Sequence, residues 1–435
     1  MTHAFLRTLA GVDPARPYGR VRRLSAGAVD ASGPALGLGR LCEIDAPGGK
    51  VAAEVVAVDR GGLVLVPLDR HADVRLDARV EAAAGGEFPV GDGFAGRAID
   101  ALGRPIDGGG PIAAEAAALP GGLVAPPLER VSPAAPLVTG IRAVDGLLTL
   151  GVGQRVGVFA ASGVGKTTLT EQLAAQVECD RAVICLIGER GREVSAFWET
   201  RPTGKAGDRA TLVAATSDES PAMRARAVEQ ALALAEHWRA RGEHVLLLLD
   251  SATRLAMALR EIGLAAGAPP TVRAYTPNVF TALPRVVERC GALRGGGAIT
   301  AVLTVLTETD DVDDPIAEIM KSLLDGHIVL GRGLAERGHF PAIDVVRSVS
   351  RQASRLVTPA HATLMREAAA LLADYDENRV MIESGVYRAG ANPRIDRAIA
   401  ARETLGGFLR QNGDECVPFT DTVAALATAL GKSHA

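Results

Sequence analysis

The sequence has few aromatic residues, since Phe, Trp and Tyr together make up only 3% of its 435 positions. The short β-like runs between residues 37 and 84 carry no aromatic platform on which bases could stack, which argues against single-strand binding. An excess of one charge is also missing, because 47 basic and 51 acidic residues leave a formal net charge of −4. Without a basic stripe, electrostatics do not favour a nucleic acid as the main partner.

Cysteine is scarce, and its five residues lack the spacing of a metal site: Cys42, Cys179, Cys185, Cys290 and Cys416. An odd, dispersed set in a chain of this length is typical of buried thiols in a reducing cytoplasm. The N-terminus has no signal-peptide pattern, and no apolar run approaches the roughly 20 residues that span a bilayer. We therefore expect a cytoplasmic protein, which can still dock on a membrane complex.

The abundant features are apolar residues and glycine. Hydrophobic residues make up 48% of the chain, which is too long for one ordinary core and predicts two or three domains. Short apolar runs separated by Gly and Asp, such as 51–58, 63–66 and 74–80, predict a small β-barrel, which we place at residues 1–90. A Gly- and Pro-rich connector follows at residues 103–136 and is expected to be extended.

From about residue 140 the pattern alternates between apolar strands and helices. Near-continuous apolar strands indicate a parallel sheet covered on both faces, so we predict an α/β core at residues 91–360. The clearest helix runs from Pro221 to Arg241, with Ser220 as N-cap. The expected strands are 155–159, 182–187, 212–215, 245–249 and 299–306. Helices expected at 361–375, 393–409 and 420–430 form a C-terminal helical domain at residues 361–435.

The strongest chemical signal is the segment 156–168, where an apolar strand runs into a phosphate-binding loop. Lys166 can reach the β- and γ-phosphates, and the hydroxyl of Thr167 can bind Mg²⁺. Gly163 and Gly165 let backbone N–H groups turn toward phosphate oxygens at the start of a helix expected over 166–178. The nucleotide-binding residues predicted here are Ala161, Ser162, Gly163, Val164, Gly165, Lys166, Thr167 and Thr168.

Two alanines depart from the usual phosphate-loop pattern. Glycine normally stands at the position of Ala160 and often at that of Ala161. Alanine does not freely adopt a positive φ, so we expect an ordinary backbone at this edge of the loop.

Two carboxylates follow predicted strands. Asp250 ends the apolar run 244–250 and can help hold Mg²⁺ at the sheet edge beside the loop, although such an aspartate can also be a plain strand-end cap. Glu189 follows the strand 182–187, which we expect next to the loop, and can polarise a water for attack on the γ-phosphate. The alternative for Glu189 is a surface ion-pair cluster with Arg190 and Arg192. Arg192 is expected to orient Glu189 or to contact a neighbouring subunit.

Two further charged features leave alternatives open. Arg351, far downstream of the loop, is by composition alone a solvated or structural cation. Residues 310–314 contain four carboxylates, but Pro315 and the lack of alternating ligand spacing argue against a calcium site. We expect a solvated loop with a helix N-cap before Pro315.

Together these motifs resemble the catalytic-subunit family of rotary ATPases. The likeness is carried by Ile-Arg-Ala-Val-Asp-Gly-Leu-Leu from residue 141, the loop at 160–167, Gly-Glu-Arg-Gly-Arg-Glu from 188, Leu-Leu-Asp-Ser-Ala-Thr-Arg at 248–254, Thr-Glu-Thr-Asp-Asp-Val-Asp-Asp-Pro-Ile from 307, and Phe-Pro-Ala-Ile-Asp with Ser-Val-Ser-Arg within 340–351. Residues 261–270 and 322–330 fit the type III secretion branch, specifically the flagellar protein export ATPases. The likeness spans roughly residues 20 to 430.

The resemblance implies a RecA-like ATPase core between a β-barrel and a helical domain, in a homohexamer with ATP sites between subunits. It implies that Glu189 is the catalytic glutamate and that Asp250 binds Mg²⁺ together with Thr167. Arg351 is then an arginine finger that acts on the neighbouring subunit's ATP. The expected catalytic set is Lys166, Glu189, Arg192 and Arg351, with Phe340 and Tyr387 near the adenine.

The implied function is Mg²⁺-dependent ATP hydrolysis that energises type III export of flagellar proteins. The implied partners are the flagellar export apparatus, a stator-like regulator, and export substrates and chaperones at the C-terminal domain. The protein would dock peripherally at the inner face of the membrane export machine. An injectisome ATPase shares this chemistry and remains an alternative.

Three other functions fit the sequence less well. A proton-translocating synthase subunit lacks support, because the C-terminal helices have no acidic run. A Rho-like RNA translocase is disfavoured by the acidic balance and the missing aromatic platform. A non-catalytic nucleotide-binding scaffold is opposed by Glu189.

Overall fold

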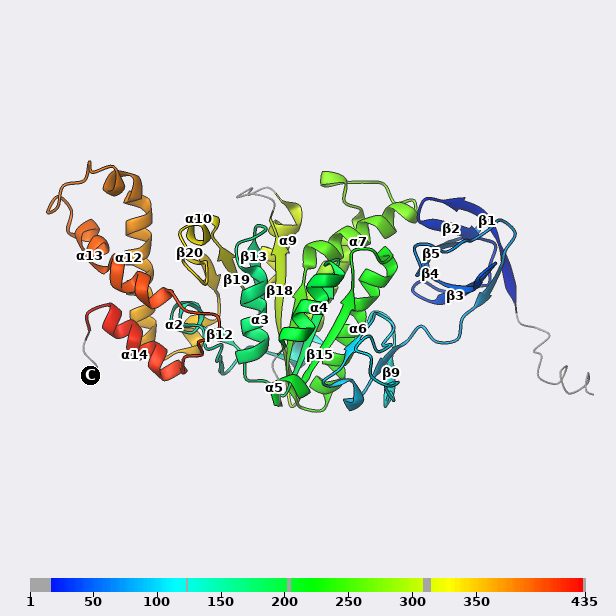
Figure 1. The fold of residues 1–435 in the computed structure, drawn as a ribbon, viewed down its shortest axis with the longest axis horizontal. Coiled ribbons are helices and arrows are strands. Elements are labelled where there is room, and N and C mark those ends of the chain that lie inside the picture. The colour runs from blue at the N-terminus through cyan, green and yellow to red at the C-terminus, as the bar shows by residue number, and fades with distance from the viewer. Residues whose placement is uncertain (1–16, 123, 202–204, 308–313, 433–435) are drawn as a thin grey trace, which may run out of the picture.

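The computed structural model describes residues 17–122, 124–201, 205–307 and 314–432 (Figure 1). Within these ranges a β-barrel, a layered α/β unit and a group of helices follow one another along the longest axis of the molecule (Figure 1). Among the described residues, no helix combines the length and apolarity needed to cross a membrane.

The N-terminal unit is a closed barrel with the strand order β1-β2-β5-β4-β3-β6. Closure pairs every strand on both sides, so no backbone edge is left open. Its core is formed by inward-facing side chains such as Ile44, Leu65 and Val80, all fully buried. The run predicted at 74–80 forms a strand only from Arg79, because turns precede it. The bounds are β1 (Tyr18–Ser25), β2 (Ala28–Ala31), β3 (Leu41–Ala46), β4 (Gly49–Asp59), β5 (Gly62–Pro67) and β6 (Arg79–Ala82).

The central sheet has the order β20-β19-β13-β18-β16-β14-β15-β8. All neighbours in this path are parallel except β20, which runs antiparallel to β19. The five predicted strands are all present and differ from their expected bounds by two residues or fewer. The bounds are β8 (Ala98–Ile99), β13 (Arg155–Ala160), β14 (Arg181–Ile187), β15 (Ala210–Ala215), β16 (His244–Asp250), β18 (Ala298–Leu306), β19 (Gly326–Leu330) and β20 (Ile343–Ser350).

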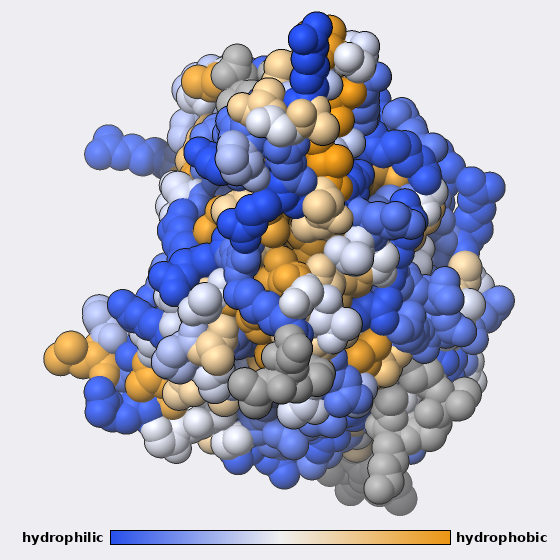
Figure 2. Space-filling model, turned by 90° about the vertical axis from the view of Figure 1, so that its left-hand side faces the viewer, coloured by the Kyte–Doolittle hydropathy of each residue, from blue (hydrophilic) through white to orange (hydrophobic). Residues whose placement is uncertain are grey.

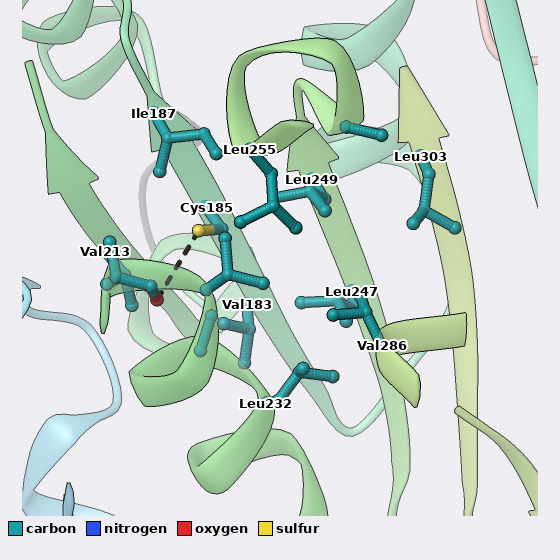
Figure 3. Close-up of a cluster of buried hydrophobic side chains, with 14 of the residues drawn as sticks. Val183, Cys185, Ile187, Val213, Leu232, Leu247, Leu249, Leu255, Val286 and Leu303 are labelled. Carbon is teal, nitrogen blue, oxygen red and sulfur yellow. Dashed lines mark hydrogen bonds between the residues drawn. The ribbon is translucent and has the colours of Figure 1, made fainter. Parts of the chain in front are cut away.

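Helices cover both faces of this sheet, as the continuous apolar strands predict. On β14, Val183, Cys185 and Ile187 belong to the core under α6 and α7, where Figure 3 shows them converging with Leu232 and Leu255. The intervening residues of β14 belong to the core under α3 and α4 on the opposite face. The helix bounds are α3 (Lys166–Gln176), α4 (Gly191–Thr200), α6 (Pro221–Ala240), α7 (Ala252–Ala265) and α8 (Pro277–Arg289).

The predicted cap of α6 is present, since the hydroxyl of Ser220 accepts a hydrogen bond from the backbone N–H of Met223 at 3.2 Å. Near the other end of α6, Trp238 is fully buried and donates its indole N–H to Asp92 Oδ1 at 2.9 Å. The helix is therefore fixed at both ends by side-chain hydrogen bonds.

The connector predicted as extended chain holds short elements that tie it to the α/β unit. Its strands pair as β7–β9, β10–β17 and β11–β12, so it runs along the core surface rather than freely between domains. The remaining short elements are β7 (Phe88–Val90), η1 (Asp92–Phe94), β9 (Ala116–Ala118), η2 (Pro127–Glu129), β10 (Arg130–Val131), β11 (Pro136–Leu137), β12 (Leu150–Gly151), α5 (Lys205–Asp208), η3 (Val272–Ala274), β17 (Gly291–Leu293), α9 (Pro315–Leu323), α10 (Arg332–Glu336) and α11 (Ala353–Leu356).

The C-terminal helices share a core with the α/β unit. Leu371, Phe408 and Leu426 pack in the same cluster as Ile141 and the helix α2. The domain boundary that we predict at residue 361 falls inside α12, which begins two residues earlier because Thr358 caps it and a proline occupies its first position. The bounds are α2 (Arg142–Leu147), α12 (Pro359–Glu383), α13 (Pro393–Leu409) and α14 (Phe419–Ala429).

Candidate active site

The phosphate-binding loop leaves β13 after Ala160 and ends where α3 begins at Lys166. Gly163 and Gly165 have φ of +78° and +95°, in the left-handed region that favours glycine. Ala160 and Ala161 are not among the described residues with a positive φ, so the loop backbone is ordinary at both alanines, as expected.

The helix behind the loop presents unpaired backbone donors to it. No side chain caps the N-terminus of α3, whose N-cap residue is Gly165. The first N–H groups of a helix have no partner within the helix, and its dipole favours negative charge at that end. The loop and α3 together therefore form an anion site suited to phosphate.

Lys166 lies between two carboxylates from other strands. Its Nζ is 3.6 Å from Glu189 Oε1 and forms a direct ion pair with Asp250 Oδ1. Asp250 is 4% exposed, and its Oδ1 also accepts a hydrogen bond from Thr304 Oγ1 at 2.7 Å. Burial raises the pKa of the Glu189 carboxyl, while the positive charges of Lys166 and Arg254 act in the opposite direction.

The strand order corrects one expectation. We expected the strand before Glu189 next to the loop, but β18 and β16 lie between β13 and β14. The carboxyl ends of parallel strands meet at one edge of a sheet, so Glu189 and Asp250 still reach the same edge as the loop. The long side chain of Lys166 bridges the remaining distance.

Gly188 and Arg254 support Glu189, and the sequence analysis missed both. Gly188 has φ +68°, and a Cβ added there would approach Arg254 Cδ to 3.1 Å. Arg254 lies in the first turn of α7, where Ser251 caps the helix. Its Nε is buried and has no hydrogen-bond partner among the described residues. The available signal was an arginine three residues after the N-cap of a helix that starts at this sheet edge.

Arg192 does not join this group in the described structure. It is exposed in the first turn of α4 and forms no ion pair with a described carboxylate. Arg190 pairs instead with Glu193 at 3.8 Å. Glu189 pairs with Lys166, so it is not part of a surface cluster with these two arginines.

Phe340 lies over the phosphate loop. Its ring is close enough that a Cβ added at Gly165 would contact it at 3.6 Å, and the residue is 46% exposed. The backbone carbonyl of Phe340 accepts a hydrogen bond from the N–H of Gln411 at 2.9 Å. Next to it, Gly413 lies beside the methyl group of Thr168. A C-terminal segment at 410–416 therefore borders the site, and no local sequence pattern predicts this contact.

Gln411 fastens this segment to the core. It is 6% exposed, and its Nε2 donates to the carbonyl oxygens of Gly140 at 2.6 Å and Glu415 at 2.8 Å. Its Oε1 accepts from the backbone N–H of Arg142 at 2.8 Å. The Arg142 side chain in turn bonds Phe408 O at 2.9 Å and forms an ion pair with Glu415.

Arg351 lies at the end of the sheet where the parallel strands begin, whereas the loop lies at the end where they finish. Its backbone N–H donates to Asp325 O, and the Asp325 N–H donates to Arg155 O at the start of β13. A strand rises about 3.3 Å per residue, so the loop at the other end of β13 is roughly 16 Å away. Arg351 is exposed, and its Nη2 donates to Lys321 O at 3.2 Å.

Tyr387 is also separated from the loop. It belongs to the segment that joins α12 to α13. This segment lies at the outer end of the C-terminal helices, away from α3 (Figure 1). Its hydroxyl donates to Asn392 O and to Asp396 Oδ1, each at 3.0 Å. One chain therefore brings together the residues of the loop, Glu189, Asp250 and Phe340, and keeps Arg192, Arg351 and Tyr387 apart from them.

The donor set suits Mg²⁺ bound with phosphates rather than an all-protein metal cage. No group of three or more His, Cys, Asp or Glu side chains in the described part of the chain could hold a metal ion. Mg²⁺ is usually bound by one or two carboxylates, substrate phosphates and water. The Asp250 carboxylate and the exposed Thr167 hydroxyl fit that pattern. Of the predicted acidic loop at 310–314, only Asp314 is described, and it caps α9 through Ile316 N and Ala317 N as expected.

Comparison with known proteins identifies two family regions. Residues 140–350 match the nucleotide-binding domain of the ATP synthase alpha/beta family, and residues 357–428 match the C-terminal domain of the type III secretion system ATPase EscN. The flagellum-specific ATP synthase of Bacillus subtilis strain 168 is 42% identical over 444 residues, covering 100% of both chains. The type 3 secretion system ATPase of Xanthomonas euvesicatoria is 41% identical over 97% of this chain and 96% of its own.

A solved structure agrees with these matches. The assembled ATPase EscN from the type III secretion system of enteropathogenic Escherichia coli is similar, with a TM-score of 0.89 at 36% identity, over 95% of this chain and 100% of EscN. The chain therefore belongs to the type III secretion ATPases of the ATP synthase alpha/beta family and is a nucleotide-hydrolysing enzyme.

Proposed function

We propose that this enzyme hydrolyses MgATP to energise type III export of flagellar proteins. The proposal rests on the convergence of Lys166, Glu189 and Asp250 at one end of the sheet, from the start of α3 and the ends of β14 and β16. A scaffold that only binds nucleotide has no need for a second, partly buried carboxylate beside the lysine. The curated relatives supply the biological setting, since they carry flagellar and type 3 secretion names.

Binding of the triphosphate relies on the loop and on Lys166. The N–H groups at the start of α3 face phosphate oxygens, and Lys166 exchanges carboxylate contacts for the β- and γ-phosphates. Thr167 and Asp250 would hold Mg²⁺, which neutralises charge that develops on the phosphates. Phe340 offers its ring face to the adenine beside the loop.

Glu189 orients the attacking water. Its carboxylate accepts a hydrogen bond from the water and polarises it for in-line attack on the γ-phosphorus. The raised pKa of Glu189 strengthens it as a proton acceptor at neutral pH. Arg254 beside it adds positive charge near the γ-phosphate position.

Arg351 completes the site of a neighbouring subunit. It is exposed and points from the far edge of its own sheet, so it serves a site other than that of its own chain. A head-to-tail contact that places Arg351 at the next subunit's γ-phosphate repeats around a ring and closes, as in the homohexamer that we propose. Arg192, exposed near Glu189, lies on the surface that would face such a neighbour.

The C-terminal helices offer the surface for partners. The solved structure of EscN in complex with its central stalk EscO is similar to this chain, with a TM-score of 0.85 at 36% identity. In this chain an apolar strip flanked by hydrophilic residues crosses the face at that end of the molecule (Figure 2). We propose that a stalk-like regulator, export substrates and chaperones bind here, with the ring docked at the cytoplasmic face of a membrane export machine.

The flagellar machine is the first candidate and the injectisome the second. Relatives with flagellar names are 40% to 42% identical and those with type 3 secretion names 41% to 43%, so identity alone does not separate them. Affinity capture of the full chain from its own cells tests the choice. Recovery of flagellar export components supports the proposal, and recovery of injectisome components overturns its flagellar part.

The hydrolytic role is tested with Glu189→Gln. The variant should bind ATP with unchanged affinity but lose hydrolysis by about 10²- to 10⁴-fold, because the amide cannot accept the proton of water. Glu199→Gln, an exposed carboxylate on α4, is the matched control and should keep full activity. Unchanged turnover of Glu189→Gln would remove Glu189 from the mechanism.

A further inference from the structure

A second cavity lies between the α/β unit and the C-terminal helices, outside the nucleotide site. It measures about 210 Å³ and is bounded by α10 and β20 on one side and by α12 and α13 on the other. We call it the α10–α12 cavity.

The α10–α12 cavity carries an excess of positive charge. Five arginines line it against two aspartates, Asp344 and Asp376. Arg332, Arg337 and Arg402 form no ion pair with any described carboxylate. Arg332 and Arg337 are exposed and Arg402 is half-buried, whereas the buried Arg289 pairs with two glutamates. Three unpaired arginines around one hollow favour an anion with more than one negative charge.

His339 reports the same electrostatic imbalance from inside the wall. It is 4% exposed, and burial, followed by the charges of Arg410, Arg402 and Arg337, lowers its pKa to about 4. No carboxylate contributes to that shift. The imidazole is therefore neutral near pH 7, and the charges that act on it are those of arginines.

The rest of the lining limits the size and shape of a ligand. Leu334, Ile343, Leu372 and Leu409 give it an apolar side, and the Arg402 guanidinium lies 4.9 Å from the centre of the Tyr375 ring, which holds it in place. The volume is below the roughly 300 Å³ at which pockets for drug-sized ligands begin. The cavity therefore suits a compact anion and not a whole nucleotide.

We propose that the α10–α12 cavity binds a small multivalent anion, with two or more phosphate or carboxylate groups held by Arg332, Arg337 and Arg402. Such an anion would join α10 to α13. His339 precedes Phe340, and Arg410 precedes Gln411, so an anion here stiffens both residues that border the nucleotide site. This regulatory consequence rests on the proposed function, whereas the binding itself does not.

The test is calorimetric titration of the full-length protein with pyrophosphate and with citrate, at constant ionic strength and with the nucleotide site saturated with MgADP. We expect one binding event per chain. A preference for pyrophosphate indicates a phosphate ligand, and a preference for citrate a carboxylate ligand. The same titration on Lys166→Ala, which lacks the phosphate-loop lysine, should give the same affinity for the anion. Loss of ATP hydrolysis is thereby distinguished from loss of anion binding in the α10–α12 cavity.

The arginine variants decide the location. Arg337→Ala/Arg402→Ala should weaken binding at least about tenfold, because two charge-assisted contacts are lost. Arg337→Lys/Arg402→Lys keeps the charge and should retain part of the affinity if the alanine variant folds poorly. Arg366→Ala, an exposed α12 arginine outside the cavity, should bind like the unmodified chain. Absence of saturable binding of both anions, or equal affinity in all variants, overturns the proposal.

Discussion

Mixing Arg351→Ala subunits with Lys166→Ala subunits should restore ATP hydrolysis that neither variant shows alone. In one chain, β13 puts roughly 16 Å between the position of Arg351 and the phosphate loop, far beyond ion-pair reach. If Arg351 acts on the neighbouring subunit's ATP, each site takes its lysine from one chain and its arginine from the next. A subunit with Lys166 intact can then be completed by a partner with Arg351 intact.

The expected magnitude follows from counting interfaces. In a ring assembled at random from equal amounts of the two variants, about one interface in four pairs an intact Lys166 with an intact Arg351. Turnover of the mixture should therefore approach about a quarter of the unmodified value. Turnover of the Arg351→Ala variant alone should fall by about 10³- to 10⁵-fold, the contribution typical of an arginine finger.

The assay is steady-state phosphate release from variants mixed as dissociated subunits and then assembled. Arg351 makes only one side-chain hydrogen bond that the structure describes, to Lys321 O, so its removal should leave the fold intact. Arg355→Ala, an exposed arginine four residues on, is the control and should stay active alone. A mixture no more active than its separate components would refute the shared site.

Three further predictions concern the rest of the chain. Gln411→Ala should raise KM for ATP several-fold with little change in kcat, because Phe340 and the segment 410–416 lose their hydrogen-bonded anchor. Steady-state kinetics measure both constants, and an unchanged KM would contradict the prediction. Trp238→Ala should lower the free energy of unfolding by about 3–5 kcal/mol, seen in denaturant titration, since a fully buried side chain leaves a cavity. Burial raises the pKa of Glu189 above its ordinary 4.5, and only the ionised carboxylate accepts a proton from water. The measured kcat/KM should therefore fall as the pH drops through that raised pKa. A pH profile of kcat/KM that falls only at or below pH 4.5 argues against Glu189 as the base.

Local sequence patterns predicted most of the secondary structure. The apolar runs at 182–187 and 245–249 become β14 and β16, because a strand buried on both faces needs apolar residues at every position. Ser220 before Pro221 marks the start of α6, because the serine hydroxyl satisfies a backbone N–H that the helix cannot. These signals depend on a few neighbouring residues, so they can be recognised without knowing the fold.

The chemistry of the loop was equally local. Gly163, Gly165, Lys166 and Thr167 lie within five positions, and their geometry follows from the strand before them and the helix after them. Glu189 and Asp250 were identified because each ends an apolar strand, and strand ends of a parallel sheet face one edge.

The arrangement across the sequence was decided by tertiary structure alone. Sequence order does not state that β18 and β16 separate β14 from β13, because a crossover can skip strands. It does not show that Gln411 returns to Phe340, or that Arg254 packs on Gly188, since such contacts join residues far apart in the chain. The amino-acid sequence was enough to name the groups that we propose bind and cleave a triphosphate. Only the packing of the sheet shows which of them lie together in one chain, because it sets the order of the strands. It places Arg351 at the end of the sheet opposite the phosphate loop, which is why we propose that Arg351 acts on another subunit's site.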